Sequence, residues 1–206
     1  TEFQRTSTFF PIPGLYQMAS DGQVWLIDPL AIEDFSAFVD LLEDPRTVKV
    51  MHACTEDLEL LRHHLGAVPQ GLFDTQFAYA YLSDRFSISH ADLVESYVGE
   101  TLSSGQTRSN WLRRPLSEAQ RHYAAEDVAY LEKLFDALRG ELEEQGRATW
   151  FAQDMPERGT HKPADPETYY RGVGRAWNLE PSELARLQAL CAWRERTAMQ
   201  LDVPRK

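Results

Sequence analysis

Residues 47–66, TVKVMHACTEDLELLRHHLG, place a strand-like run directly before a helix-like run. The first part, 47–51, carries valines at alternate positions and follows an Asp-Pro turn, which is typical of a strand. The second part predicts a helix over about 56–65 that ends at Gly66. Because a strand followed by a helix is the repeating unit of α/β folds, this stretch predicts an α/β layer.

The same alternation extends over about residues 1–150. Another strand is predicted at 24–27, VWLI, after the turn sequence SDG. Apolar residues at helical spacing predict further helices over about 32–42, 75–82, 91–98 and from 117 to about 146. The longest of these opens with Ser117 and Gln120, a capping-box pair. The sequence therefore predicts one α/β domain over 1–150.

The composition changes near residue 155. Prolines, a glycine and charged residues without apolar periodicity predict a linker over 151–166. Helical patterns follow, at 169–177 and after Pro181, which suits the first turn of a helix. A segment of about 40 residues is too short for a core of its own, so 167–206 is predicted to be an incomplete all-helical domain.

The overall composition bounds the function. The 206 residues carry 21 Lys+Arg and 32 Asp+Glu, a net charge of −11, which argues against broad coating of a phosphate backbone but leaves a small nucleic-acid site open. Two cysteines far apart in the sequence argue against a disulfide scaffold and against a zinc finger. No run approaches the roughly 18 apolar residues of a membrane span. We expect a soluble, cytoplasmic protein with no membrane contact.

Tyr123 and Asp127 are four residues apart, so both lie on one face of the longest predicted helix, beside its apolar stripe. A carboxylate against apolar neighbours is costly without a partner. That partner could be a divalent cation, or equally the phenol of Tyr123. Spacing alone leaves both interpretations open.

Asp57 lines up with the apolar Leu60 and Leu61, whereas Glu56 faces solvent. The simpler interpretation of Asp57 is an acid in a first helical turn, favoured by the helix dipole. Glu2 lies in what resembles the end of a strand that begins before Thr1, and alone it would be an unremarkable surface acid. Together with Asp127, these inward carboxylates suit a cluster of hard oxygen ligands for Mg²⁺ or Mn²⁺.

Five separated blocks, in order and spacing, resemble the ribonuclease D family, the DEDDy type of 3′→5′ exoribonucleases. The blocks are TEF at 1–3 with Arg5-Thr6 and Phe9-Phe10-Pro11, HACTEDL at 52–58, FDTQ at 73–76, WLRRPL at 111–116 and YAAEDVAYL at 123–131. The resemblance covers about residues 1–150. The tail is similar to the start of the helical accessory domain that this family shares with RecQ-type helicases.

The resemblance implies a ribonuclease H-like fold, a mixed sheet flanked by helices, that trims the single-stranded 3′ ends of RNA such as tRNA precursors and releases nucleoside 5′-monophosphates. It implies two Mg²⁺ or Mn²⁺ ions on Glu2, Asp57 and Asp127, and an active-site tyrosine at Tyr123. The family also has an Asp directly before Thr1, which this sequence lacks. Either an upstream strand carrying it precedes Thr1, or that position is altered and the chain is inactive.

Three residues are candidates for substrate contact. Phe3 could stack on a terminal base, Arg108 could contact a phosphate, and His52 could lie near the ions. The simpler interpretations are core packing for Phe3 and His52 and loop solubility for Arg108. Two other functions stay open, a catalytically inactive RNA-binding module and a DNA 3′→5′ exonuclease. The sequence indicates no particular protein partner.

Overall fold

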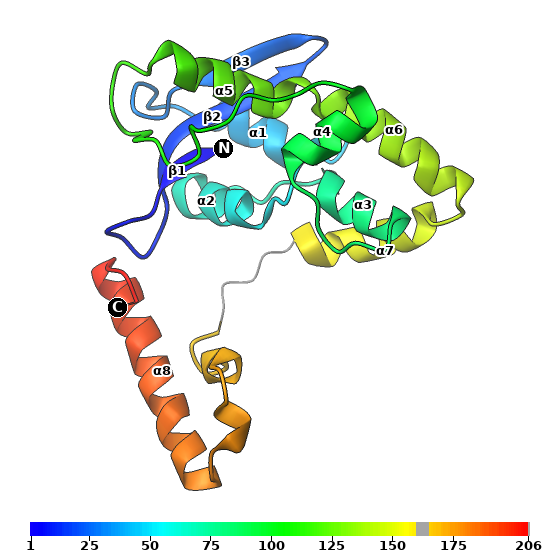
Figure 1. Ribbon diagram of the computed structural model, residues 1–206. Helices are drawn as coiled ribbons and strands as arrows, with labels where there is room; N and C mark the ends of the chain where they lie inside the picture. The colour runs from blue at the N-terminus through cyan, green and yellow to red at the C-terminus, as the bar shows by residue number, and fades with distance from the viewer. Residues whose placement is uncertain (160–164, 206) are drawn as a thin grey trace. The chain divides into compact units, whose positions relative to one another are not determined.

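The computed structural model describes residues 1–159 and 165–205 (Figure 1). Its described residues form two compact units. The first contains 1–4 and 13–159, and the second contains 5–12 and 165–205. The predicted exonuclease-like domain corresponds to most of the first unit, and each unit is described by itself below.

The first sheet has the strand order β1-β2-β3, with β1 at Glu2–Gln4, β2 at Ile12–Ser20 and β3 at Gln23–Ile27. Strands β2 and β3 are antiparallel, with pairs from Tyr16↔Ile27 to Ser20↔Gln23. The two residues that join them, Asp21 and Gly22, both have positive φ angles, of 51° and 73°. An Asp-Gly pair with two positive φ angles matches the twist of a hairpin, so the SDG turn fixes this register.

The second sheet pairs β4, Lys49–Met51, in parallel with β5, Leu72–Asp74. The connecting helix α2 spans Thr55–Leu65 and ends at Gly66 with φ 68°. Strand β4 and helix α2 are the strand and the helix that residues 47–66 predict. Because parallel strands present their carboxyl ends at one edge, the turn after β4 and the last residue of β5 lie together there.

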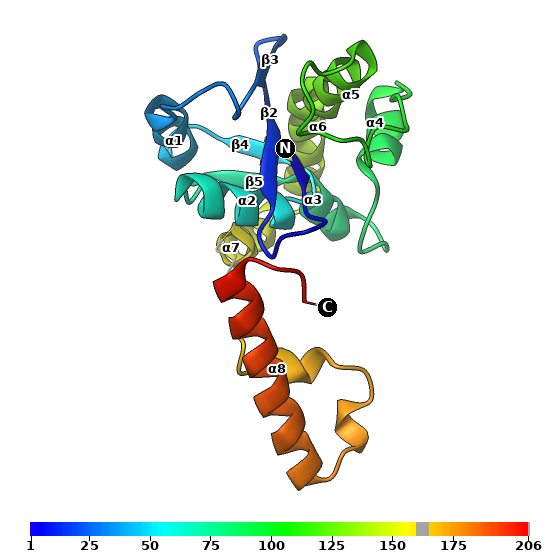
Figure 2. The ribbon, with the colours of Figure 1, turned by 90° about the vertical axis from the view of Figure 1, so that its left-hand side faces the viewer.

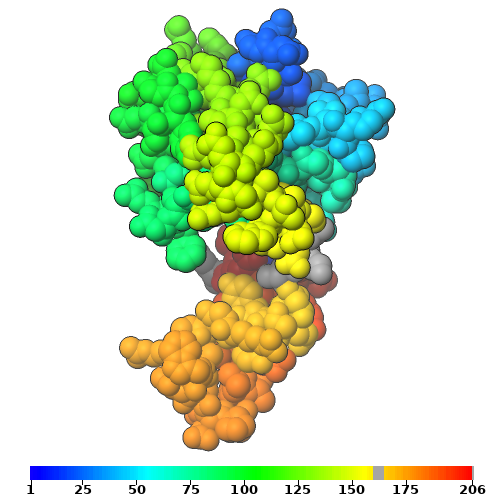
Figure 3. All heavy atoms as spheres, turned by 90° about the vertical axis from the view of Figure 1, so that its right-hand side faces the viewer, coloured from blue at the N-terminus to red at the C-terminus, as the bar shows by residue number. Residues whose placement is uncertain are grey.

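Six more helices complete the first unit: α1 (Ser36–Glu43), α3 (Thr75–Leu82), α4 (His90–Val98), α5 (Glu118–Ala129), α6 (Leu131–Glu144) and α7 (Ala148–Gly159). Figure 2 shows the strands between α1 on one side and α4, α5 and α6 on the other. The buried leucines of α6, Leu134, Leu138 and Leu142, pack in the main core with Phe73 and Phe151. Figure 3 shows the outer face of this layer, with α6 (yellow-green) beside α3 and α4 (green).

The prediction of a single helix from 117 to 146 is wrong in one respect, because the helix breaks at Tyr130. This residue is both the C-cap of α5 and the N-cap of α6. The break lets the two halves bury different faces. Helix α5 buries Ala124 beside Trp111, whereas α6 buries its leucines in the main core. A continuous apolar stripe does not reveal such a change of partner.

The linker prediction is wrong for residues 151–159, which belong to α7. Phe151 and Met155, four residues apart, are buried in the main core. Pro156 lies inside the helix, and proline with charged neighbours imitates a linker composition. Residues 160–164 of the predicted linker lie outside the described residues. The strands β2 and β5 were not predicted at all.

In the second unit, the expected helical pattern at 169–177 is two short 3₁₀ turns, Tyr169–Gly172 and Ala176–Asn178, and α8 spans Pro181–Leu201. Glu195 on α8 is fully buried and accepts hydrogen bonds from Arg194 (2.8 Å) and Arg205 (2.7 Å). Pro181 lies in the first turn of α8, as predicted. Across the described ranges, the search for a helix with the length and hydropathy of a membrane span finds none.

Candidate active site

A cavity of about 590 Å³ lies in the first unit between β2, β4 and the helices around them. Its polar lining includes Asp57, Asp127, Tyr123 and His52. Its apolar lining comes from both helical layers, with Phe38, Leu42 and Leu61 on one side and Val128, Leu131 and Phe135 on the other. Acidic side chains from separate elements therefore line one cavity whose other walls are mainly apolar.

Asp57 is the third residue of α2, and its half-buried carboxylate accepts hydrogen bonds from both the Thr1 amino group (2.9 Å) and the Thr1 hydroxyl (2.7 Å). Glu56 beside it is exposed, as predicted. The helix begins after Cys54, whose side chain makes no cap hydrogen bond, so Thr55 is the first helical residue. The first-turn position also places Asp57 where the helix dipole favours an anion.

Glu2 on β1 and Asp127 on α5 form a carboxyl-carboxyl hydrogen bond. Burial is the main cause that raises the pKa of Glu2, to about 8, and the charge of Asp127 adds to it. Burial likewise raises the pKa of Asp127, to about 6. Desolvation and mutual repulsion both disfavour the ionised forms of these two acids, so a nearby positive charge would stabilise them.

Thr1 lies among these acids, with its nitrogen and its hydroxyl oxygen both within hydrogen-bond distance of the Asp57 carboxylate. The three predicted ligands, Glu2, Asp57 and Asp127, are thus near one another and influence one another's ionisation. Within residues 1–159 and 165–205, no three acidic, histidine or cysteine side chains stand close enough to make a finished metal site by themselves. A largely buried set of hard carboxylate oxygens nevertheless fits a divalent metal ion.

Tyr123 lies one turn before Asp127 on α5, with its ring 6.2 Å from that of Trp111. Its hydroxyl contacts the Thr107 hydroxyl at 3.3 Å. The simpler interpretation paired this hydroxyl with Asp127, and the described residues show no such hydrogen bond. Burial raises the pKa of Tyr123, and the charges of Asp127 and Glu2 add to the rise. The phenol is therefore protonated at neutral pH and can donate a hydrogen bond.

The predicted substrate contacts have mixed positions. Phe3 is half-buried and packs against the cluster that contains Tyr16, Leu60 and Leu61, which favours the core-packing interpretation. Arg108 is exposed in the loop before α5, beside the residue that contacts Tyr123. The structure brings neither side chain into contact with the three acids.

His52 uses both ring nitrogens within the protein. Nδ1 bonds to the Thr75 hydroxyl (2.8 Å) and Nε2 to the Ile88 carbonyl (3.1 Å). Burial lowers the pKa of His52, which keeps the ring neutral. These contacts favour the interpretation of His52 as a satisfied core histidine, although it also lines the cavity.

His90, the first residue of α4, was missed from the sequence. Its ring lies 5.3 Å from that of His52 and lines the same cavity, and its buried Nε2 has no hydrogen-bond partner among the described residues. Burial is the main cause that lowers the pKa of His90, to about 4. A histidine after a helix cap carries no pattern that separates it from a surface residue, so only the fold reveals it.

Replacing His90 by leucine is expected to reduce the acid sensitivity of the fold. A folded pKa of about 4, below the unfolded value of roughly 6.5, means that only the unfolded chain binds this proton between those pH values. The free energy of unfolding therefore falls as the pH drops from 6.5 to 4, by about 2 kcal/mol after allowing for partial exposure. Urea unfolding at pH 7.5 and pH 4.5 measures the difference.

The exposed His122 is the matched control for that measurement. His122→Leu should leave the pH dependence of unfolding close to that of the parent chain. If His90→Leu also leaves it unchanged, His90 does not stay neutral in the folded protein.

A family model described as 3′-5′ exonuclease matches residues 1–143. Ribonuclease D of Pseudomonas paraeruginosa is 45% identical over 207 aligned residues, which cover all of this chain and 55% of the relative. The chain spans about half the length of the curated relatives it matches.

Two solved structures extend the comparison. Escherichia coli RNase D, described as an exoribonuclease involved in structured RNA processing, superposes with a TM-score of 0.88 at 38% identity, over all of this chain and 55% of that one. Brucella melitensis NrnC with bound Mg²⁺ has a TM-score of 0.62 at 29% identity, over 70% of this chain and 73% of that one. The mixed α/β architecture is thus that of the RNase D exonuclease core, a fold that implies divalent metal ions. The family match over more than two thirds of the sequence shows that this chain belongs to the 3′-5′ exonuclease family.

Proposed function

We propose that the chain carries the catalytic site of a 3′→5′ exoribonuclease that trims single-stranded RNA 3′ ends, as in tRNA precursors, and releases nucleoside 5′-monophosphates. The observation that carries the proposal is the grouping of the buried or half-buried carboxylates of Glu2, Asp57 and Asp127, with Tyr123 one turn before Asp127 on α5. The matched relatives named ribonuclease D support RNA as the substrate.

The residues that would hold two Mg²⁺ or Mn²⁺ ions are Glu2, Asp57 and Asp127. When bound, such ions supply a water nucleophile at neutral pH and stabilise charge on the leaving oxygen. The three carboxylates would hold such ions through their oxygen atoms. They come from a strand, a helix start and a helix interior, so the fold fixes their relative positions.

Tyr123 has the role of orienting the attacking water. Its raised pKa rules it out as the main base at neutral pH, but its hydroxyl can direct a water by a hydrogen bond. We propose Arg108 as a phosphate contact near the tyrosine, since its loop lies beside Tyr123. For Phe3, packing in the core fits the structure better, although its exposed edge could still reach a terminal base.

Matched RNA and DNA oligonucleotides with free and blocked 3′ ends test the proposal, in Mg²⁺ and in Mn²⁺. We expect stepwise shortening of RNA from the free 3′ end with release of 5′-monophosphates, and slower shortening of DNA. Equal rates on both would favour the DNA exonuclease. RNA binding without products, in every metal, would favour the inactive module.

Two extended chains, with Asp or Ala added directly before Thr1, make the assay sharper. The family pattern has an Asp at this position. The Asp extension is expected to be the more active of the two, and equal activity would remove that position from the site.

A further inference from the structure

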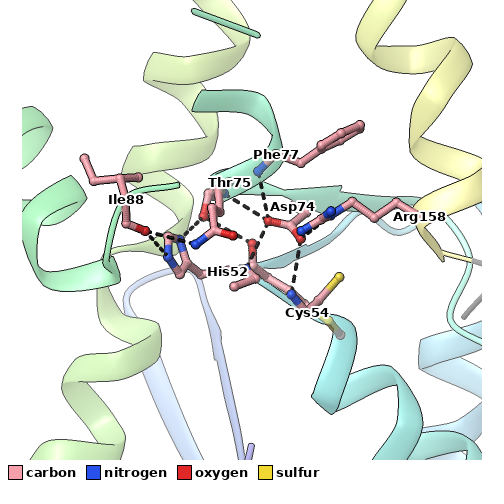
Figure 4. Close-up of polar contacts among 10 residues, drawn as sticks. His52, Cys54, Asp74, Thr75, Phe77, Ile88 and Arg158 are labelled. Atoms are coloured by element: carbon pink, nitrogen blue, oxygen red, sulfur yellow. Dashed lines mark hydrogen bonds and ion pairs between the residues drawn. The ribbon is translucent and has the colours of Figure 1, made fainter. Parts of the chain in front are cut away.

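Asp74, the last residue of β5, is a fully buried carboxylate with five donors. Oδ1 accepts hydrogen bonds from the backbone N–H groups of Ala53 (3.0 Å), Gln76 (3.0 Å) and Phe77 (3.2 Å). Oδ2 accepts from the backbone of Cys54 (3.2 Å) and from Nε of Arg158 (2.8 Å). Figure 4 shows Asp74 bonded to both Cys54 and Arg158, two residues that are far apart in the sequence.

Two of these donors belong to the turn that starts α2. Ala53 has a φ of 53°, a left-handed conformation that is unfavourable for a residue with a side chain. Cys54 is the residue directly before the helix, and its side chain does not cap the first turn. By accepting from the N–H groups of both Ala53 and Cys54, the carboxylate of Asp74 holds this turn in its strained conformation. Asp57, three residues after Cys54, takes its position from that turn.

Arg158, near the end of α7, balances the buried charge. Its guanidinium also lies 4.9 Å from the centre of the Phe77 ring, which holds it beside α3. Burial by itself raises the pKa of Asp74, but the hydrogen bond and charge of Arg158 and the backbone donors outweigh burial and lower the pKa. Without Arg158, a fully buried carboxylate would lose its only charged hydrogen-bond donor among the described residues.

We propose that Arg158 and Asp74 are a positioning pair, which fixes the start of α2 and so holds Asp57 ready to bind a cation. Neither residue needs to touch the substrate. The inference rests on the proposed function only in assigning Asp57 to the metal site. It adds a residue from the end of α7, remote from the sequence blocks, to the parts of the molecule on which that site depends.

The test compares Arg158→Met with Arg139→Met. Arg139 is a close match, because it also pairs with a carboxylate, Glu143 (3.9 Å), and lies 5.3 Å from the centre of an aromatic ring, Phe135, on the surface of α6. Mn²⁺ binding is measured by electron paramagnetic resonance without RNA. Losing an outer-shell partner of a metal ligand typically costs about 10-fold in affinity, so we expect Arg158→Met to bind Mn²⁺ about 5- to 10-fold more weakly. The control should stay within about twofold of the parent.

Amide hydrogen exchange in the metal-free proteins provides the second measurement. Arg158→Met should speed exchange at Ala53 and Cys54, whereas the amides of the α6 core should keep their protection. This local pattern separates positioning from general destabilisation, which would raise exchange across the whole unit.

Unchanged Mn²⁺ binding and unchanged exchange at Ala53 and Cys54 in Arg158→Met would overturn the proposal. If that variant does not fold, Arg158→Lys keeps the charge without the fixed guanidinium geometry and should show the same local exchange to a smaller extent; parent-like exchange in it overturns the proposal as well. If the parent chain binds no Mn²⁺, the exchange comparison alone decides. If Mn²⁺ binding depends on Arg158 but no RNA is shortened, the proposed function fails and the positioning pair stands.

Discussion

Asp127→Asn is expected to reduce RNA 3′-end hydrolysis by about a thousandfold or more while the protein stays folded. Asparagine keeps the shape of the side chain but removes the negative charge and one of the ligand oxygens. A metal ion contributes several kcal/mol of charge stabilisation in the transition state, and each 1.36 kcal/mol is a factor of ten in rate. The loss should appear in kcat, because the RNA contacts away from the reacting phosphate remain.

The fold should tolerate this change well. The surroundings of Asp127 disfavour its ionised form, because burial is the main cause that raises its pKa, to about 6. A neutral amide next to Glu2 removes the repulsion between the two acids, so the thermal midpoint should stay equal or rise. The control is Asp136→Asn, an exposed acid on α6, which should leave both rate and stability unchanged. A variant at Asp127 with more than about a tenth of the parent rate would contradict the assignment of this residue as a metal ligand.

The acids of this site could be predicted because helix periodicity fixes which side chains point inward. Asp57 and Asp127 each lie on an apolar face, and the structure places both on the cavity. Glu2 depended on the family resemblance, since three residues of a strand carry no periodic signal. The proximity of these three carboxylates arises from tertiary packing, whereas the sequence pattern predicts only the strand and helices that carry them.

Asp74 shows where local patterns end. Its role as the N-cap of α3 is local, because its side chain accepts from the backbone of Gln76 and Phe77. Its bonds to Ala53, Cys54 and Arg158 connect positions that are 20 to 84 residues away along the chain. Such contacts follow from the parallel pairing of β4 with β5 and from the packing of α7, and α7 itself was taken for a linker.

Arg114 provides a second example. Its guanidinium binds both carboxylate oxygens of Asp28 and donates to the carbonyl oxygens of Gly14 (2.7 Å) and Trp111 (2.8 Å). An arginine in a loop shows no period, so its long-range partners cannot be read from spacing.

Gly14→Ala is expected to destabilise the first unit by about 3 kcal/mol, the upper end of what overpacking usually costs. A Cβ atom at Gly14 would lie 2.6 Å from Cβ of Trp111 and 3.0 Å from its carbonyl oxygen. Trp111 is 1% exposed and packs with Leu15 and Ala124, so it has no room to retreat. Because the close atoms are the Cβ and the backbone carbonyl of Trp111, and not the end of a flexible side chain, the backbone must shift at Gly14 and at Trp111.

The shift would also reach the site. Trp111 packs against the ring of Tyr123, and Arg114 bonds to the carbonyl oxygens of both Gly14 and Trp111. The thermal midpoint should fall by about 10 °C for a unit of this size, and RNA hydrolysis should fall with it even below the melting temperature.

Gly140→Ala is the matched control, because Gly140 lies inside α6 and, apart from the neighbouring backbone of that helix, an added Cβ there meets nothing within 4 Å. There the same methyl group should raise stability by about 0.5–1 kcal/mol, since alanine loses less backbone entropy than glycine in a helix. The two substitutions add identical atoms and should change the thermal midpoint in opposite directions. If Gly14→Ala melts at the parent temperature, the close approach of β2 to Trp111 is not a rigid feature of the fold, and the position of Tyr123 must be fixed from the α5 side alone.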